Sequence, residues 1–270
     1  MKVTLLISTY NWAPALGLCL KSIGRQTVLP DEIIIADDGS TPDTKALIDQ
    51  YRTMVSIPLK HVWHEDKGFR KTIILNKAVS LADMPYVIQI DGDVILHRKF
   101  VEDHISFARK GYFNIGRRAN LPMEITQKLI SGGSLDFSCL DPKIQKMELG
   151  IRFPTVLSAL LSQKSSQNSN SVFGSNMSYW KADFVKINGY DNTMTGWGAE
   201  DKDLAQRLIN LGISKRKLRY AAIQHHLFHK ENNQDNHDLQ MQWVQKVIAE
   251  KITECPDGLK QLGGAFLYYS

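Results

Sequence analysis

The sequence predicts an α/β fold with a mostly parallel central sheet flanked by helices. Two observations support this prediction. Short apolar runs alternate with segments of helical periodicity over residues 1–112, which is the pattern of repeated strand–helix–strand units. A polar motif rich in Asp, Ser, Asn or Gly also follows several of these apolar runs. Because ligands bind at the carboxyl ends of parallel strands, the motifs are expected to meet in one site.

Residues 1–112 contain the predicted strand–helix repeats. Continuous runs of β-branched residues and leucine, as in Val3–Ser8, are typical of strands buried on both faces. Asn11 is expected to cap the first helix, with Pro14 in its first turn. The expected strands are Val3–Ser8, Glu32–Ala36, Leu59–Trp63 and Tyr86–Ile90, and the expected helices run from Asn11 to about Arg25, over Thr41–Arg52 and over Lys71–Leu81.

The pattern changes after residue 112, so residues 113–270 are predicted to form a second lobe of one continuous domain. The polar stretch Ser162–Ser171 is either a lid over the site or an insert without order. Gly212 is expected to end a helix that has Leu204 and Leu208 on one face. The ordered segments expected here are Val172–Trp180, Asp183–Tyr190, a helix over Ala199–Leu211 and a helix over Met241–Ile252.

Composition limits the possible classes of protein and partner. The chain has 270 residues, 43% of them apolar, which is enough for a large core. Its net charge of +5 is not concentrated in a long run of Lys and Arg, so no nucleic-acid partner is predicted. Three widely spaced cysteines fit a reducing cytosol. Without a signal-peptide core or a long apolar run, we expect a cytoplasmic location, with peripheral contact at the inner membrane face as an alternative.

The most informative motif is Asp91-Gly92-Asp93, which follows the apolar run Tyr86–Ile90. Two carboxylates one residue apart at a strand end can face a single divalent ion, and oxygen ligands suit Mg²⁺ or Mn²⁺. Gly92 allows the backbone to approach a ligand closely. The alternative interpretation is a pair of solvated loop acids, which the buried strand before them makes less favourable.

Asp37-Asp38-Gly39-Ser40 follows the second predicted strand. One interpretation is a strand-to-helix turn with a capping serine. The other is ligand contact, because a carboxylate here can accept hydrogen bonds from a nucleobase N–H or from ribose hydroxyls. Position alone does not decide between the two.

The second lobe carries two further clusters. Glu200, Asp201 and Asp203 start a predicted helix, where the helix dipole favours negative charge, and they follow a glycine–tryptophan–glycine turn around Trp197. A histidine cluster, His225-His226-Leu227-Phe228-His229, offers imidazole ligands for a divalent ion. Each cluster also has a purely structural interpretation, as first-turn acids and as core histidines. The spacing of a zinc protease, His-Glu-x-x-His, is absent.

The first-lobe motifs together resemble the nucleotide-binding half of the family 2 glycosyltransferases, which have the GT-A fold. The resemblance covers roughly residues 1–110 and rests on Ile7–Asn11, Asp37–Ser40 and Asp91–Asp93. It implies that Ser8, Thr9 and Asp38 contact the nucleoside, often uridine, that Asp91 faces the ribose beside Gly92, and that Asp93 holds the metal. It also implies that Arg70, in Gly68-Phe69-Arg70, helps to close the pocket. Leu75 stands where relatives often carry an arginine, so Lys71 or Lys77 would supply that contact.

Gly196-Trp197-Gly198-Ala199-Glu200-Asp201 is similar to a segment of galactosyltransferases and polypeptide N-acetylgalactosaminyltransferases. This similarity implies that Asp201 is the general base and that Glu200 positions the acceptor. Trp197 would then be an aromatic platform for a sugar. His226 would complete the metal site with Asp93, with His229 as the second choice, and Asn176 would contact the donor or acceptor sugar.

These inferences predict an inverting, metal-dependent glycosyltransferase. Its donor would be a nucleotide sugar, most simply a UDP-sugar, its cofactor Mn²⁺ or Mg²⁺, and its acceptor a glycan or a lipid-linked glycan. The alternative from another class is a non-catalytic nucleotide-sugar-binding module. A nucleotidyltransferase or a nicotinamide dehydrogenase is disfavoured, because no glycine-rich phosphate loop follows Val3–Ser8.

Overall fold

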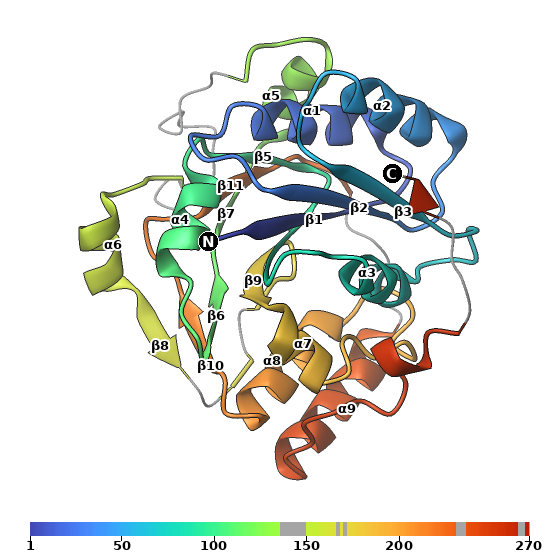
Figure 1. Ribbon diagram of the computed structural model, residues 1–270, viewed down its shortest axis with the longest axis vertical. Helices are drawn as coiled ribbons and strands as arrows, with labels where there is room; N and C mark the ends of the chain where they lie inside the picture. The colour runs from blue at the N-terminus through green and yellow to red at the C-terminus, as the bar shows by residue number, and fades with distance from the viewer. Residues whose placement is uncertain (136–149, 166–167, 170–171, 231–235, 264–267, 270) are drawn as a thin grey trace.

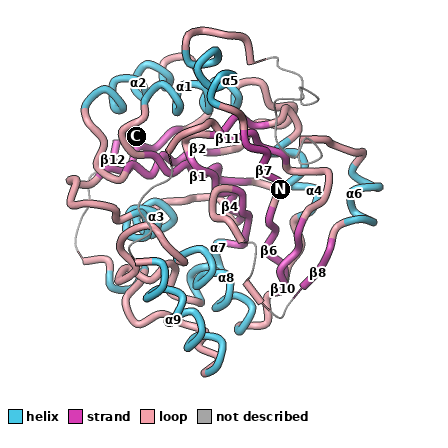
Figure 2. The backbone as a smooth tube through the Cα atoms, turned by 180° about the vertical axis from the view of Figure 1, so that it is seen from behind, coloured by secondary structure: helices cyan, strands magenta, loops and turns pink. Residues whose placement is uncertain are grey.

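The computed structural model describes residues 1–135, 150–165, 168–169, 172–230, 236–263 and 268–269. In this part of the chain a twisted sheet lies between two layers of helices (Figure 1). Helices α1 (Ala13–Ile23), α2 (Pro42–Arg52) and α5 (Met123–Ile130) lie on one side, and α3 (Lys71–Ser80), α7 (Lys181–Lys186) and α8 (Glu200–Asn210) on the other, as the reverse view also shows (Figure 2).

The described strands of the main sheet have the order β12-β3-β2-β1-β4-β9-β6-β10-β8. Strands β3, β2, β1, β4, β6 and β10 run in one direction, and β12, β9 and β8 run against them. The predicted α/β fold with a mostly parallel sheet is therefore confirmed. The strands are β1 Val3–Thr9, β2 Glu32–Asp37, β3 Leu59–Trp63, β4 Tyr86–Asp91, β6 Tyr112–Ile115, β8 Gln163–Ser165, β9 Asn176–Trp180, β10 Ser214–Lys217 and β12 Tyr268–Tyr269.

The apolar residues of β1 explain why it lies at the centre of the sheet. Leu5 and Ile7 point into one core, which contains residues of α1. Leu6, between them, points into the other core, which contains residues of α3, α7 and α8. Because alternate side chains of a strand face opposite sides, a continuous apolar run suits a strand that is covered on both faces.

A small second sheet joins a strand of residues 1–112 to two strands of residues 113–270. Its order is β5-β11-β7, with β5 at Val94–Leu96, β11 at Ile223–His226 and β7 at Arg117–Asn120. The register pairs His226 with Val94, so the end of β11 lies next to the turn that follows β4. The remaining elements are α4 Phe100–Phe107, α6 Thr155–Leu161, α9 His237–Ala249 and a 3₁₀ turn at Leu259–Gln261.

Helix α8 is anchored by a buried ion pair. Arg207 and Asp203 are both fully buried, and Arg207 Nε donates to Asp203 Oδ2 over 2.9 Å. Arg207 also donates to the backbone oxygens of Ile187 and Gly189, each over 2.7 Å. These bonds fix the start of α8, which carries the acids of the predicted catalytic segment.

Some sequence predictions differ from the structure. Asn11 does not cap the first helix: its backbone has a positive φ of 45°, and its side chain accepts a hydrogen bond from the Thr41 amide. The helix predicted over Met241–Ile252 begins and ends earlier, as α9. The segment Ser162–Ser171, for which a lid or an insert was predicted, lies partly outside the described residues. Cys139 also lies outside them, whereas Cys19 and Cys255 are buried and form no disulfide. None of the helices in the described ranges is long and apolar enough to cross a bilayer.

Candidate active site

A cavity of about 850 Å³ opens at the carboxyl ends of the parallel strands, and a smaller one of about 330 Å³ adjoins it. The two share Lys71, Asp91 and Asp93 among their lining residues. The larger one is lined by both lobes, and the smaller one mainly by residues 8–92. The predicted convergence of distant polar motifs on one site therefore agrees with the structure.

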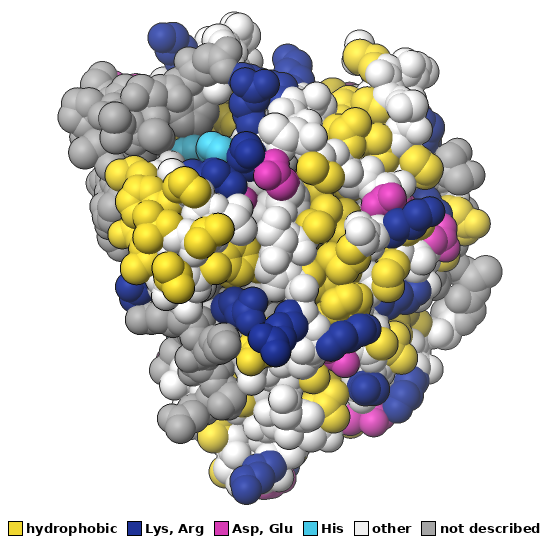
Figure 3. Space-filling view, turned by 60° about the vertical axis from the view of Figure 1, so that its left-hand side comes forward, with side chains coloured by type: hydrophobic (Ala, Val, Ile, Leu, Met, Phe, Trp, Pro, Cys, Tyr) yellow, Lys and Arg dark blue, Asp and Glu magenta, His cyan; other side chains and the backbone are white. Residues whose placement is uncertain are grey.

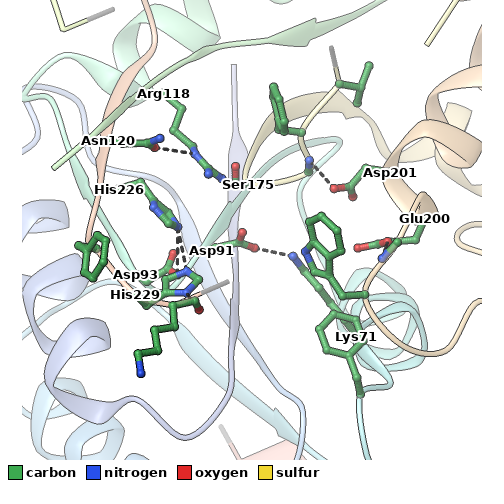
Figure 4. Close-up of a pocket in the computed structure, with 18 of the residues that line it drawn as sticks. Lys71, Asp91, Asp93, Arg118, Asn120, Ser175, Glu200, Asp201, His226 and His229 are labelled. Atoms are coloured by element: carbon green, nitrogen blue, oxygen red, sulfur yellow. Dashed lines mark hydrogen bonds and ion pairs between the residues drawn. The ribbon is translucent and has the colours of Figure 1, made fainter. Parts of the chain in front are cut away.

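Asp93, His226 and His229 form a potential metal site. Asp93 Oδ2 lies 3.3 Å from His226 Nε2 and 3.2 Å from His229 Nε2 (Figure 4). Asp93 Oδ1 is buried without a hydrogen-bond partner among the described residues. Burial alone would raise the pKa of Asp93, but the hydrogen bonds from His226 and His229 hold it well below its ordinary value. One carboxylate and two imidazoles form a donor set that suits a divalent transition metal, with Mn²⁺ among the candidates.

Asp91 lies next to this cluster and is held by two neighbours. Ser8 Oγ donates to Asp91 Oδ1 over 2.6 Å, and Lys71 Nζ donates to the same oxygen over 2.7 Å. Burial would lower the pKa of Lys71, but the charges of Asp91, Asp201 and Glu200 raise it well above its ordinary value. Lys71 is therefore a fixed cation at the point where the two cavities meet.

Asp201 and Glu200 lie across the larger cavity from the histidines (Figure 4). Asp201 accepts a hydrogen bond from the Gly174 amide over 2.7 Å and one from the Tyr190 hydroxyl over 3.1 Å. Burial raises the pKa of Asp201, and the charge of Lys71 opposes that rise. Burial and the charge of Asp201 raise the pKa of Glu200 to about 7. Paired carboxyl groups with raised pKa values are typical of acid–base sites.

The smaller cavity is lined by Ser8, Thr9, Asp38 and Gly92. Asp38 is buried, with Oδ1 2.6 Å from His64 Nε2 and Oδ2 accepting from the Arg70 amide over 2.9 Å. A Cβ atom on Gly92 would lie 3.1 Å from the Ser8 carbonyl oxygen. The lack of a side chain at position 92 therefore lets the turn after β4 lie close against β1.

Two family models match the chain. The one described as Glycosyl transferase family 2 matches residues 4–148, more than half of the chain. The chain belongs to glycosyl transferase family 2. A second model, described as N-terminal domain of galactosyltransferase, matches residues 156–230 of this family 2 protein. Both sequence resemblances are thus confirmed.

Named relatives are distant and longer. A validoxylamine A glucosyltransferase of Streptomyces hygroscopicus subsp. limoneus is 26% identical over 234 residues, which cover 78% of this chain and 48% of that protein. A chondroitin synthase of Escherichia coli is 21% identical over 238 residues, covering 83% of this chain and 34% of that protein. The family 2 chain spans about half of these relatives or less.

Solved structures share the fold. Residues 1–349 of S. aureus TarS in complex with UDP-GlcNAc give a TM-score of 0.61 at 15% identity, covering 96% of this chain and 69% of that one. The mannosyltransferase PcManGT of Pyrobaculum calidifontis, in complex with GDP-Man and Mn²⁺, gives a TM-score of 0.55 at 18% identity. This match covers 84% of this chain and 56% of that one. The predicted GT-A fold is confirmed.

Most of the predicted site residues line the two cavities. Two do not. Asn176 is buried, and its amide nitrogen donates to the backbone oxygens of Arg117 and Ala222, each over 2.8 Å. Its side-chain oxygen lies 3.0 Å from His104 Nε2, so the hydrogen bonds of Asn176 hold strands together instead of reaching a sugar. Arg70 approaches the site only through its backbone amide on Asp38.

The structure adds residues that sequence reasoning did not assign. Arg118 and Ser175 line the larger cavity, and Ser175 Oγ is buried without a hydrogen-bond partner in the described part of the chain. Arg118 stands in no predicted motif, and Ser175 directly precedes Asn176, the residue of that segment that was predicted to contact a sugar. Lys71 was expected only as a substitute for an arginine, yet it contacts Asp91 directly. His229 joins His226 on Asp93 instead of competing with it.

Proposed function

We propose that this family 2 protein is an inverting, metal-dependent transferase that moves a sugar from a nucleoside diphosphate to an acceptor hydroxyl. One observation carries the proposal. The Asp93–His226–His229 cluster and the Asp201–Glu200 pair line opposite sides of one cavity. A diphosphate leaving group and an attacking hydroxyl need these two kinds of group on opposite sides of the anomeric carbon.

The smaller cavity would hold the nucleoside, so that residues 1–112 supply the donor side and residues 113–270 most of the acceptor side. Ser8, Thr9, Asp38 and Gly92 line it, and the fixed carboxylates of Asp38 and Asp91 can accept hydrogen bonds from a base or a ribose. TarS, which shares the fold, has been crystallised with UDP and with UDP-GlcNAc. These complexes support uridine as the proposed nucleoside, and the GDP-Man complex of PcManGT makes guanosine the alternative.

Asp93, His226 and His229 would hold Mn²⁺ or Mg²⁺. The buried, unpartnered Oδ1 of Asp93 fits this role, because a cation would satisfy it. The solved structure of PcManGT, which has the same fold, is a complex with GDP-Man and Mn²⁺. When bound, such a metal neutralises the charge of the departing diphosphate.

Asp201 would remove the proton from the acceptor hydroxyl as that oxygen attacks. The Gly174 amide and the Tyr190 hydroxyl orient its carboxylate, and its raised pKa suits a base that works near neutral pH. Glu200 would position the acceptor, and Trp197, which lines the same cavity, would pack against a sugar. Attack opposite the leaving group gives inversion without a covalent intermediate.

The acceptor would be a glycan or a lipid-linked glycan. Chondroitin synthase, a glycan-building relative, covers most of this chain. A non-catalytic module that binds nucleotide sugars is the alternative, and Asp201 and Glu200 are the residues that argue against it.

The test is release of UDP from a panel of UDP-sugars with Mn²⁺ and glycan acceptors. Asp201→Asn is expected to lower transfer by about 10²–10⁴-fold while leaving UDP binding intact. Asp238→Asn is the matched control, because the Asp238 side chain is fully exposed. Undiminished transfer by Asp201→Asn would refute the assignment of the base. Binding of UDP-sugars without any turnover would favour the non-catalytic module.

A further inference from the structure

Helix α6 (Thr155–Leu161) presents its apolar side chains to solvent. Val156 is 77% exposed and Leu160 is 79% exposed, and Leu157 and Leu161 are exposed as well. Ser158 is the buried side chain of this helix, and its hydroxyl donates to the Arg219 carbonyl oxygen. The helix thus buries a polar residue and exposes four large apolar ones, the reverse of an ordinary surface helix.

These side chains form one continuous apolar patch, not scattered surface residues. At i, i+1, i+4 and i+5 they share one face of this seven-residue helix, opposite the buried Ser158. Figure 3 shows hydrophobic side chains gathered into a protruding cluster with Lys and Arg side chains beside it. Clustered apolar exposure of this kind marks a surface that meets another apolar phase, whereas single exposed apolar residues need no explanation.

The segments next to α6 are basic. Strand β8, directly after α6, pairs with β10, and Arg219, two residues beyond β10, is bonded to Ser158 and Ser162. Residues 150–165 and 214–219 contain no Asp or Glu. Their basic residues are Arg152, Lys164, Lys215, Arg216, Lys217 and Arg219.

Not all of these cations are available to a partner. Arg152 is paired with Asp103, and Lys215 and Arg216 are buried. Lys217 and Arg219 are partly exposed, and Arg109 is exposed. The guanidinium groups of Arg109 and Arg216 both lie over the Tyr112 ring. An exposed apolar helix with accessible cations beside it is a surface for a partner that is both apolar and anionic.

We propose that α6 docks on the surface of an anionic lipid bilayer. The leucine and valine side chains would enter the boundary between headgroups and acyl chains, and the neighbouring cations would contact lipid phosphates. A second copy of this chain fits less well. Two α6 surfaces facing each other would bring the same basic segments together, and like charges repel.

Contacts link the docking surface to the cavity. Phe153, just before α6, stacks on Tyr220 with ring centroids 4.2 Å apart, and the Arg117 guanidinium lies 5.5 Å from the Tyr220 centroid. The next residue on β7, Arg118, lines the larger cavity. Docking through α6 would therefore hold the cavity close to the bilayer, where a substrate attached to a lipid could reach it.

The test is co-sedimentation of the purified chain with lipid vesicles. One set is phosphatidylcholine alone, and the other contains about a third phosphatidylglycerol. Binding is expected only to the anionic vesicles and is expected to weaken as salt rises. The Val156→Ser/Leu160→Ser variant should bind at least about tenfold more weakly. Met54→Ser/Leu239→Ser is the matched control, because Met54 is 65% and Leu239 is 67% exposed elsewhere on the surface.

Three results would overturn the proposal. They are absence of binding by the unmutated chain, equal binding by the α6 variant and the control variant, and a dimer in sedimentation velocity that only the α6 variant loses. The last result would assign the patch to a second copy. Circular dichroism of both variants checks that they fold. The salt dependence of vesicle binding is measured on the unmutated chain, so it does not depend on the folding of a variant.

Discussion

Lys71 Nζ lies 2.7 Å from Asp91 Oδ1, so the first residue of α3 is joined to the last residue of β4. Burial raises the pKa of Asp201 and of Glu200, and the charge of the same ammonium group opposes that rise. Lys71 therefore couples Asp91, which both cavities share, electrostatically to the two acids of the larger cavity.

Replacing Lys71 by Met is expected to shift the pH dependence of transfer. Without the ammonium charge, the pKa of Asp201 and of Glu200 rises further, so the base is protonated up to a higher pH. The acidic limb of the pH–rate profile should move to higher pH, and the maximal rate should fall. Lys21→Met, at an exposed position on α1, is the control. A profile for Lys71→Met that overlays that of the control would show that Lys71 has no such role.

The sequence allowed the sheet to be predicted because buried parallel strands leave a simple signal. Each of the first four strands begins at the residue predicted for it, and none ends more than one residue away from its predicted end. Asp91 and Asp93 could be assigned to a site for the same reason, since strand ends meet at one edge. Helix α8 was predictable from its apolar face, and Asp201 is the second residue of that helix.

Other contacts depend on chain paths that no local pattern encodes. His229 reaches Asp93 only because the chain turns after β11, where Trp12 packs against the His229 ring at 5.8 Å. Gly174 and Ser175 both line the larger cavity, and Asn176 is the next residue along the chain. The side chain of Asn176 nonetheless points to β7, because Asn176 is the first residue of β9, whereas Gly174 and Ser175 lie in the turn before that strand.

Replacing Gly174 by Ala is expected to disable the site without abolishing nucleotide binding. A Cβ atom at position 174 would lie 2.0 Å from Asp201 Oδ1, so the carboxylate must move away from its present place. Displacement of a reacting group by about 1 Å can cost about 10²-fold in rate. Steady-state transfer and UDP binding by calorimetry would separate the two effects.

Gly263→Ala is the control for this substitution, because nothing lies within 4 Å of a Cβ atom there. If Gly174→Ala transferred sugar at the rate of the unmutated chain, the present orientation of Asp201 would not be the working one.

Removal of divalent metal is expected to abolish transfer and to lower thermal stability. A ligand at about a hundred times its Kd stabilises the folded state by about 2.7 kcal/mol. Mn²⁺ should therefore raise the melting temperature of the chelator-treated protein. His226→Ala and His229→Ala should each reduce this rise, because both histidines lie on Asp93.

His237→Ala is the matched control for these two variants, since His237 lines the same cavity outside the cluster. If Mn²⁺ raised the melting temperature equally in His226→Ala, His229→Ala and His237→Ala, the metal would have to bind elsewhere. If only His226→Ala lost this rise in melting temperature, His226 would be the single histidine ligand, as the sequence predicted.

Glu200 is expected to make the fold less stable as pH rises. Its pKa is about 7 in the folded chain, because of burial and the charge of Asp201, against an ordinary value of 4.5. Between these two pH values the folded state keeps a proton that the unfolded state has lost. The contribution of Glu200 to the free energy of unfolding therefore falls as pH rises from 4.5 to about 7.

Glu200→Gln removes this penalty while it also removes a group proposed to hold the acceptor. The variant should be more stable than the unmutated chain at about pH 8, by on the order of 2 kcal/mol, and equally stable near pH 4. Urea unfolding at the two pH values measures the difference, with the exposed Glu250→Gln as control. Higher stability together with slower transfer would mean that Glu200 is kept for chemistry at a cost to the fold. Lower stability at the higher pH would mean that Lys71 more than offsets the burial of this carboxyl group.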